Sequence, residues 1–202
     1  MNVRGNSKKI IAGALFAISM FSVSTGLTGC LTDDGDKGGG GDSVTSKSTT
    51  LGAQASATGS FLEADAMAAK TIAEAKTIAS NIDLVLAFSE SQTSLSIYSP
   101  KAAADGIAGT PGFDFVKTTL GTSARDTEIR VISTAGFDTV KTTVGVKALY
   151  DAGVKDDDGR LAAQQNTTFA IKTNGGKIVA IKITAVSGTT SGTATVEGKT
   201  KF

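Results

Sequence analysis

The side chains in this sequence that could do chemistry are mainly carboxylates. The chain has 19 Asp and Glu residues, one cysteine and no histidine. Without histidine it cannot assemble a Ser-His-Asp or Cys-His catalytic group, or a metal site with imidazole ligands. A pair of carboxylates could still hydrolyse a glycoside, but no pair of acids stands out by its spacing. The sequence therefore favours a domain that is not an enzyme, and a small carboxylate-based hydrolase stays as an alternative.

The densest group of acids is Asp156, Asp157 and Asp158, within Val154–Arg160. Oxygen ligands at alternate positions followed by glycine are what a helix–loop–helix calcium loop needs. When the following glycine is set at the sixth position, the first and twelfth positions fall on a valine and a glutamine instead of acids. The three aspartates are thus weak candidates for a metal site, and a solvated turn is the favoured interpretation. We expect no dissociable cofactor.

The one cysteine, Cys30, follows a segment with the plan of a secretory signal peptide. Met1–Gly29 carries three basic residues near its start, then an uncharged apolar run from Ile10 to Val23, then small residues. That run is shorter than the roughly 20 residues that span a bilayer. We therefore expect residues 1–29 to be removed, and a retained membrane anchor is the alternative.

The end of this segment, Leu27-Thr28-Gly29-Cys30, resembles the lipobox of bacterial lipoproteins, Leu-x-Gly-Cys. The resemblance implies that Cys30 receives a diacylglycerol thioether, that the chain is cut before it, and that the new amino group is acylated, for example with palmitate. The implied partner is membrane lipid. Two or three acyl chains, at ~0.8 kcal/mol per buried CH₂, would make this attachment long-lived.

The residues after Cys30 bear on location. Leu31 stands where an aspartate would resemble an inner-membrane retention signal, so the resemblance implies the cell outer membrane. Asp33, Asp34 and Asp36 resemble the acidic signals that send lipoproteins of Bacteroidetes-like bacteria to the cell surface. The plainer alternative is that these acids only keep the segment solvated. Both interpretations stay open.

Composition divides the rest of the chain into a tether and a domain. Residues 30–60 are rich in Gly, Ser, Thr and charge, which is typical of a flexible tether, and residues 61–202 have the size of a single globular domain. Removing Met1–Gly29 takes three of the 20 basic residues and no acid, leaving 17 against 19, or a net charge of −2. A mildly acidic body is not expected to bind nucleic acid.

Periodicity predicts an α+β domain dominated by antiparallel strands. The Ala-rich stretch Ala66–Ser80 has the spacing of a helix. Ile82–Phe88 and Ser94–Ser99 predict a hairpin. Residues 167–202 predict three strands joined by short turns, with Val179, Ile181, Ile183 and Ala185 on one side of the middle strand. The expected architecture is thus a C-terminal three-stranded meander plus a hairpin, with two or three short helices.

A ten-residue repeat lies in the middle of the chain. Gly112–Gly121 reads GFDFVKTTLG and Gly136–Gly145 reads GFDTVKTTVG, so eight of ten positions agree. The favoured interpretation is a repeated structural piece that buries its Phe and Val, with a short helix in the second copy. A duplicated recognition loop is the alternative.

The stretches NIDLVLAF, LSIYSP and FAIKTNGGKIVAIKITAVSGTTSG are similar to small surface-lipoprotein domains of Bacteroidetes-like bacteria. Those domains are mostly uncharacterised, so the similarity implies location and transfers no site residues. We expect a non-catalytic structural or binding module with a surface glycan or protein partner. One alternative is a glycan-binding accessory protein that uses Tyr98 or Tyr150, and another is a fimbrial or coat subunit, suggested by the aromatic-poor composition.

Overall fold

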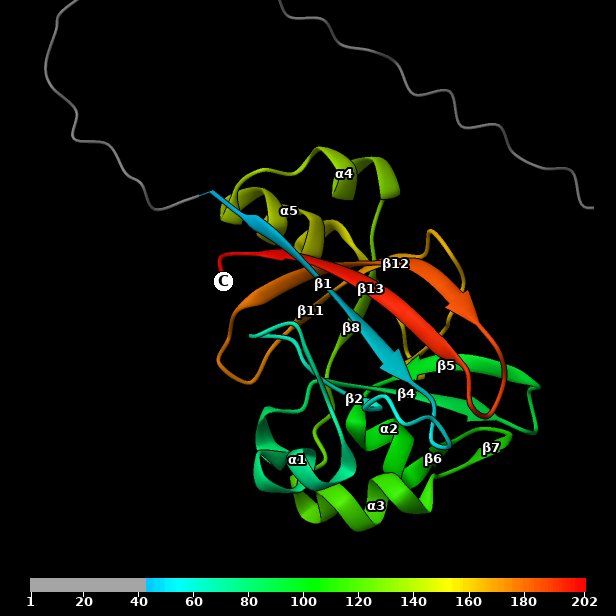
Figure 1. Cartoon of the computed structure of the whole chain (residues 1–202). Coiled ribbons are helices and arrows are strands. Elements are labelled where there is room, and N and C mark those ends of the chain that lie inside the picture. Colours follow the sequence, from blue (N-terminus) through cyan, green and yellow to red (C-terminus); the bar gives the residue numbers. More distant parts are fainter. Residues whose placement is uncertain (1–42) are drawn as a thin grey trace, which may run out of the picture. The chain divides into compact units, whose positions relative to one another are not determined.

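The computed structural model of the chain describes residues 43–202. In this part, antiparallel strands form two main sheets and one small hairpin, and five short α-helices lie on the outer faces (Figure 1). The predicted α+β class is confirmed, with more helices than expected. Because every strand pairing is antiparallel, neighbouring strands can be joined by short turns.

The larger sheet has six strands in the order β1-β13-β12-β11-β8-β9, and the smaller has five in the order β10-β5-β4-β2-β3. The strands of the larger sheet are β1 (Thr45–Gly52), β8 (Ile129–Val131), β9 (Val154–Lys155), β11 (Thr168–Lys172), β12 (Ile178–Ser187) and β13 (Thr193–Thr200). Those of the smaller sheet are β2 (Phe61–Glu63), β3 (Ala68–Lys70), β4 (Leu84–Ser89), β5 (Ser94–Tyr98) and β10 (Arg160–Ala162). A separate hairpin joins β6 (Gly106–Ile107) to β7 (Thr110–Pro111).

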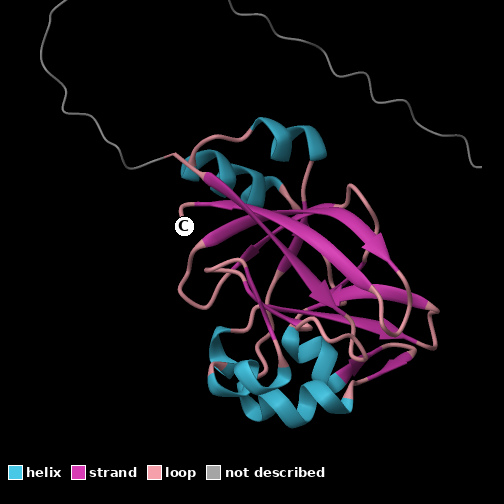
Figure 2. Cartoon of the chain, in the orientation of Figure 1, coloured by secondary structure: helices cyan, strands magenta, loops and turns pink. Residues whose placement is uncertain are grey.

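The elements stack in four layers, with a sheet against a sheet and helices outside both (Figure 2). On the outer face of the smaller sheet lie α1 (Ile72–Thr77), α2 (Pro100–Asp105) and α3 (Asp114–Leu120). On the outer face of the larger sheet lie α4 (Thr134–Thr139) and α5 (Thr143–Ala152). Each helix layer closes its own small apolar cluster.

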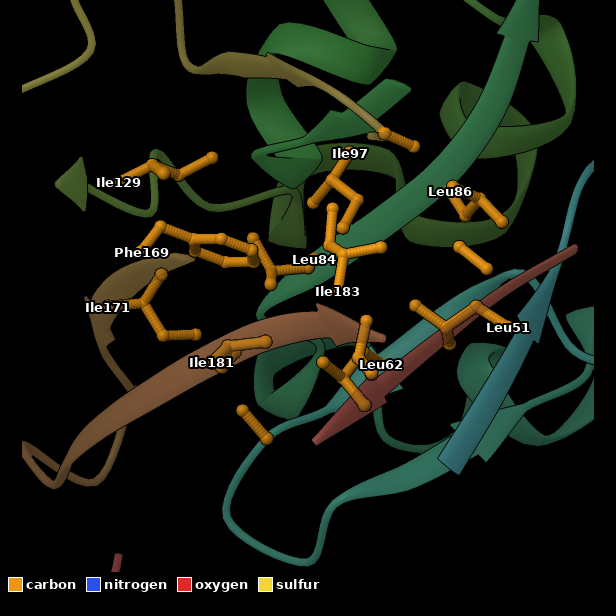
Figure 3. Close-up of a cluster of buried hydrophobic side chains, with 14 of the residues drawn as sticks. Leu51, Leu62, Leu84, Leu86, Ile97, Ile129, Phe169, Ile171, Ile181 and Ile183 are labelled. Atoms are coloured by element: carbon orange, nitrogen blue, oxygen red, sulfur yellow. The ribbon is translucent and has the colours of Figure 1, made fainter. Parts of the chain in front are cut away.

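The main core fills the space between the two sheets (Figure 3). Alternate residues of the strands point into it, as expected for sheets buried on one face. The large side chains in this core include Leu51, Leu62, Leu84, Leu86, Ile97, Ile129, Phe169, Ile171, Ile181 and Ile183. Side chains from both sheets point toward one another, so this cluster holds the layers together.

The predicted meander and hairpin are both present. Strands β11, β12 and β13 follow one another as antiparallel neighbours, and β4 pairs with β5. One detail of the prediction was wrong: a bulge after Ile183 shifts the register of β12, so that Ala185 is exposed and Val186 packs against the core. A bulge adds one residue to one strand and so changes which side chains point inward.

The predicted boundary of the domain at residue 61 was wrong. Strand β1 lies within the expected tether and pairs with β13 along its whole length, from Thr45 opposite Thr200 to Gly52 opposite Thr193. The first half of β1 is exposed, which explains its polar composition, while Leu51 is fully buried in the main core. The domain therefore includes β1 and the residues that follow it, whereas residues 30–42 of the predicted tether, with Cys30, lie outside the described residues.

The helix predicted over Ala66–Ser80 was wrong in its first part. Its N-terminal third forms β3, which pairs with β2, and only α1 is helical before a 3₁₀ turn. A capping box starts α1: Glu74 N–H donates to Thr71 Oγ1, and Thr71 N–H donates to Glu74 Oε2 at 2.8 Å. Alanine favours helix locally, but pairing with β2 decides the conformation of β3.

The two copies of the repeat lie in different helix layers. The first copy forms α3, and the second spans the end of α4, a break and the start of α5. The predicted helix in the second copy is therefore present but interrupted. Val116 of the first copy is buried in the cluster under α1–α3, and Phe137 of the second is buried in the cluster under α4 and α5. Both copies thus pack a side chain of the repeat into a core, as the structural interpretation expects.

Candidate functional site

Four of the side chains singled out in the sequence lie along one polar cleft. Two hollows of about 140 and 460 Å³ share Asp126 and Glu128 in the segment that leads into β8. One hollow is lined by the run Asp156–Asp158, and the other by Tyr150 of α5 and by the β11–β12 turn. We call the two hollows together the polar cleft. The topology brings these residues together from segments that are distant in the sequence.

Tyr150 is held by the charges around it. Its Oη donates to Glu128 Oε1 at 3.2 Å, and the Arg130 guanidinium lies 4.8 Å from the centre of its ring. Arg130 Nε donates to the same Glu128 oxygen. This hydrogen bond from Arg130 is the main cause that lowers the pKa of Glu128, whereas burial is the main cause that raises the pKa of Tyr150. Near neutral pH, Glu128 is therefore an ionised carboxylate that accepts from Tyr150 and Arg130. None of these three side chains is poised to exchange a proton.

The aspartate run forms a turn that is closed by a hydrogen bond from the backbone. Asp156 Oδ1 accepts the backbone N–H of Arg160 at 2.9 Å, and Gly159 adopts a φ of 63°, which suits glycine. Asp157 and Asp158 are exposed. Within residues 43–202, no group of three or more acidic, histidine or cysteine side chains is placed to hold a metal ion. The geometry of the turn is that of a solvated loop stabilised by its own carboxylate.

A buried acid that the sequence did not single out lies beside the polar cleft. Asp83 is 1% exposed, and its Oδ1 accepts from Arg125 Nη1 at 2.8 Å and from Asn174 N at 3.3 Å. Its Oδ2 accepts from Ala64 N at 3.0 Å. Burial is the main cause that raises the pKa of Asp83, and its three donors oppose that shift. An acid inside the apolar run IDLVLAF was the signal that could have identified it.

These acids do not make a glycosidase pair. Such a pair needs one protonated and one ionised carboxyl group, both open to the same sugar. Asp83 has the raised pKa, but its side chain is almost fully buried and ion-paired to Arg125. Glu128 is held ionised by Arg130. The two groups therefore hold segments of the fold in place, and their surroundings do not support acid catalysis.

A separate hollow, of about 350 Å³, opens at the tip of the β4–β5 hairpin. We call it the hydroxyl pocket. Its lining comes from the loop after β1, from the β4–β5 turn and from the segment through β7 into α3. The residues that line it are Gln54, Phe88, Ser89, Glu90, Ser91, Thr110, Pro111, Gly112 and Phe113.

Hydrogen bonds fix the walls of the hydroxyl pocket. The Gln54 carboxamide donates to Phe88 O and accepts from Phe88 N, both at 2.8 Å, as an adjacent strand would. Ser89 Oγ and Ser91 Oγ lie 3.0 Å apart, and Thr110 Oγ1 lies 3.4 Å from Ser91 Oγ. Sequence reasoning missed this pocket, because serine and threonine in turns show no diagnostic spacing.

The two tyrosines proposed for glycan stacking differ in access. Tyr98 is fully buried, and its ring stacks edge-on against Phe113 at 5.3 Å. It cannot offer a ring face to a ligand from solvent, so that assignment was wrong. Tyr150 is half-buried, with Arg130 over its ring. A sugar stacking there would compete with the guanidinium.

Cys30 lies outside the described residues, so its lipidation stays a prediction. Among residues 43–202, no helix has the length and apolar character needed to cross a membrane. Comparisons of the chain with protein-family models, with characterised proteins and with solved structures gave no match.

Proposed function

We propose that this chain is a lipoprotein of the bacterial outer membrane, attached through acylated Cys30, that holds a non-catalytic binding domain on the cell envelope. The observation that carries the proposal is Leu27-Thr28-Gly29-Cys30 at the end of a signal-like segment. Strand β1, which begins at Thr45, belongs to the folded domain, so the stretch between the anchor and the domain is shorter than the sequence predicted. A binding role is favoured because Glu128 in the polar cleft and Asp83 beside it are each ion-paired to an arginine, whereas the hydroxyl pocket is open.

The lipid anchor is tested by the mass of the mature N-terminal peptide from bacterial membranes. We expect it to begin at Cys30 and to carry a diacylglyceryl group and an N-acyl chain. Cys30→Ser should give a protein without lipid that no longer partitions into detergent. Adding Ser43→Cys to that variant is the control, because it restores a thiol without the lipobox and should not restore lipid. An unmodified thiol at Cys30 in the wild-type protein would overturn the anchor.

Protease added to intact cells tests the surface location. If Asp33, Asp34 and Asp36 direct export, wild-type protein should be digested and the triple Asp→Asn variant should be protected. If these acids only keep the segment solvated, the variant and the wild type should behave alike. Protection of the wild-type domain while a known surface protein is cut would place the domain on the periplasmic side.

The coat-subunit alternative needs a sheet edge that can accept a strand from another copy. The outer edge of β1 is the longest free edge in the described part of the chain. It is closed at both ends, since Val44 N donates to Lys141 O and Gly52 N donates to Gly59 O. Between these bonds only Ser46, Ser48 and Thr50 direct backbone groups outward, by strand alternation. A straight strand from a second copy would meet both flanking loops, so this geometry disfavours assembly by strand addition.

A further inference from the structure

We propose that the hydroxyl pocket binds one neutral sugar ring. This assignment rests on the proposed binding role of the domain and names its ligand. The volume of about 350 Å³ is near the lower end of the roughly 300–1,000 Å³ that small-molecule sites occupy, which suits a small ligand. The lining combines hydroxyl and carboxamide groups with two phenylalanine rings.

The hydroxyl groups of the pocket have unused hydrogen-bonding capacity. A hydroxyl donates once and accepts twice, so Ser89, Ser91 and Thr110 together offer nine places. The contacts Ser89–Ser91, Ser91–Thr110 and Gln92–Thr110 take two, two and one of them, or five. Ser89 and Thr110 are almost fully buried in the wall of the pocket, whereas Ser91 is exposed, so Ser91 is the most accessible of the three hydroxyl groups. Sugar hydroxyls also both donate and accept, and they match such a surface.

Unpartnered hydroxyl groups continue beneath the pocket. Ser96 pairs with Ala87 across β4 and β5, so strand alternation places it on the same face of the sheet as Ser89. The side-chain oxygens of Ser96 and Tyr98 are buried and have no hydrogen-bond partner in residues 43–202. Buried polar groups in native proteins are normally paired. On this face of the hairpin, therefore, some hydroxyl groups are not satisfied by hydrogen bonds within the domain.

The apolar part of the pocket is positioned in advance. The Phe113 ring stacks edge-on against Tyr98, with ring centres 5.3 Å apart, and lies tilted against Phe115, with ring centres 6.0 Å apart, which restricts the orientation of the Phe113 ring. Phe88 packs partly against the main core. Sugars bury their C–H faces on such rings while their hydroxyl groups bond to polar neighbours. A ring that is already fixed loses little conformational entropy on binding.

The charge of the lining selects a neutral ligand over an anionic one. No lysine or arginine lines the hydroxyl pocket, and its one charged side chain is Glu90. Glu90 is exposed and forms no ion pair with the described residues. A phosphate or a uronic acid would meet a carboxylate with no compensating cation. A neutral sugar can donate its hydroxyl protons to Glu90, which makes a charge-assisted hydrogen bond.

The test is a titration of the detergent-solubilised mature protein with single sugars, followed by calorimetry and by saturation transfer in NMR. The probes are glucose, galactose, mannose and N-acetylglucosamine, with glucuronate as the anion and tetramethylammonium as the cation. We expect at least one neutral sugar to bind, glucuronate to bind more weakly, and added salt to have little effect. Ser91→Ala and Glu90→Gln should each weaken binding by about 3- to 10-fold, the equivalent of one hydrogen bond.

Matched controls are Ser48→Ala on β1 and Glu197→Gln on β13. They make the same types of substitution outside the pocket. They should leave sugar binding unchanged, and thermal unfolding of all four variants checks that they remain folded. The proposal is overturned if no neutral sugar binds, if the controls weaken binding as much as the pocket variants, or if tetramethylammonium binds instead and is displaced by salt. The lipid anchor is tested separately, by the mass of the N-terminal peptide. Failure of sugar binding and failure of the anchor can therefore be told apart.

Discussion

Replacing Arg125 with methionine would leave a buried carboxylate without its cation. Asp83 is 1% exposed and Arg125 is 25% exposed, and the described residues offer Asp83 no other salt bridge. Breaking a buried ion pair by removing one partner costs about 3–5 kcal/mol. We expect the lower part of that range near neutral pH, because the backbone N–H groups of Ala64 and Asn174 still donate to Asp83. This is a large share of the ~5–15 kcal/mol that stabilises a typical domain.

The loss of stability caused by Arg125→Met should depend on pH, in a direction set by the pKa of Asp83. Burial raises the pKa of Asp83 in the folded protein above that of the unfolded chain, so the folded state binds this proton more tightly. Its contribution to stability is therefore greatest below the unfolded pKa and falls as pH rises through the folded pKa. Arg125 lowers the pKa of Asp83, so Arg125→Met should raise this pKa further. The pH range in which protonated Asp83 stabilises the fold should then extend to higher pH. Acid should thus reduce the penalty of the substitution.

The assay is urea unfolding of wild type and Arg125→Met at a series of pH values from neutral to mildly acidic. Arg125→Met/Asp83→Asn is the control, because an amide at position 83 carries no charge. The double variant should recover part of the stability at neutral pH and should lose the pH dependence that is specific to Arg125→Met. A cost below about 1 kcal/mol at neutral pH, or a cost that does not change with pH, would refute a buried carboxylate stabilised by Arg125.

Three further outcomes are expected. Gly112→Ala should lower the melting temperature far more than Gly136→Ala, because the new Cβ would lie 2.1 Å from a backbone oxygen of α2 at the first position and 2.5 Å from a movable leucine methyl at the second. Leu51→Ala should cost about 2–5 kcal/mol in urea unfolding, whereas a residue of a free tether would tolerate it. Glu128→Gln should lower the pKa of Tyr150, followed by ultraviolet absorbance in a Tyr98→Phe background, because the Glu128 charge and its hydrogen bond both raise that pKa.

The sequence predicted those parts of the fold whose pairing is local. The β4–β5 hairpin and the β11–β13 meander show alternating or continuous apolar runs with turn residues between them. Strand β1 pairs with β13, which lies at the other end of the domain, and half of β1 is exposed. Its residues therefore needed little apolar character, and no local pattern marked it. The same holds for β3, an Ala-rich segment whose pairing with β2 overrides its helical preference.

The candidate sites were harder to predict because they depend on contacts between distant segments. Sequence spacing identified the Asp156–Asp158 run but could not show that Tyr150 and Glu128 would lie along the same cleft. The hydroxyl pocket joins Gln54, Ser89 and Thr110, whose residue types are common in any turn. The acid within IDLVLAF gave another local signal, since a charge in a buried segment requires a partner.

The repeat shows how one short sequence can serve two structural contexts. Thr118, in the seventh position of the first copy, donates to Asp114 O within α3. The matching Thr142 instead accepts Gly145 N–H and caps α5, and it forms a bridge with Ser43 just before β1. A residue that can bond its own helix or cap the next one allows both conformations. Pairing next to β1 thus coincides with the break that separates α4 from α5.

The two positions at which the copies of the repeat differ also reflect the different surroundings of the two copies. In the first copy, Phe115 stacks on Phe61 at 5.8 Å, and Leu120 is buried. In the second, Thr139 is exposed and donates to a backbone oxygen of its own helix, and Val144 is 68% exposed. Two copies of a recognition loop should keep the same side chains available to a ligand. Here the large apolar residues are kept where they are buried and reduced where they are exposed, so packing in each helix layer accounts for the differences.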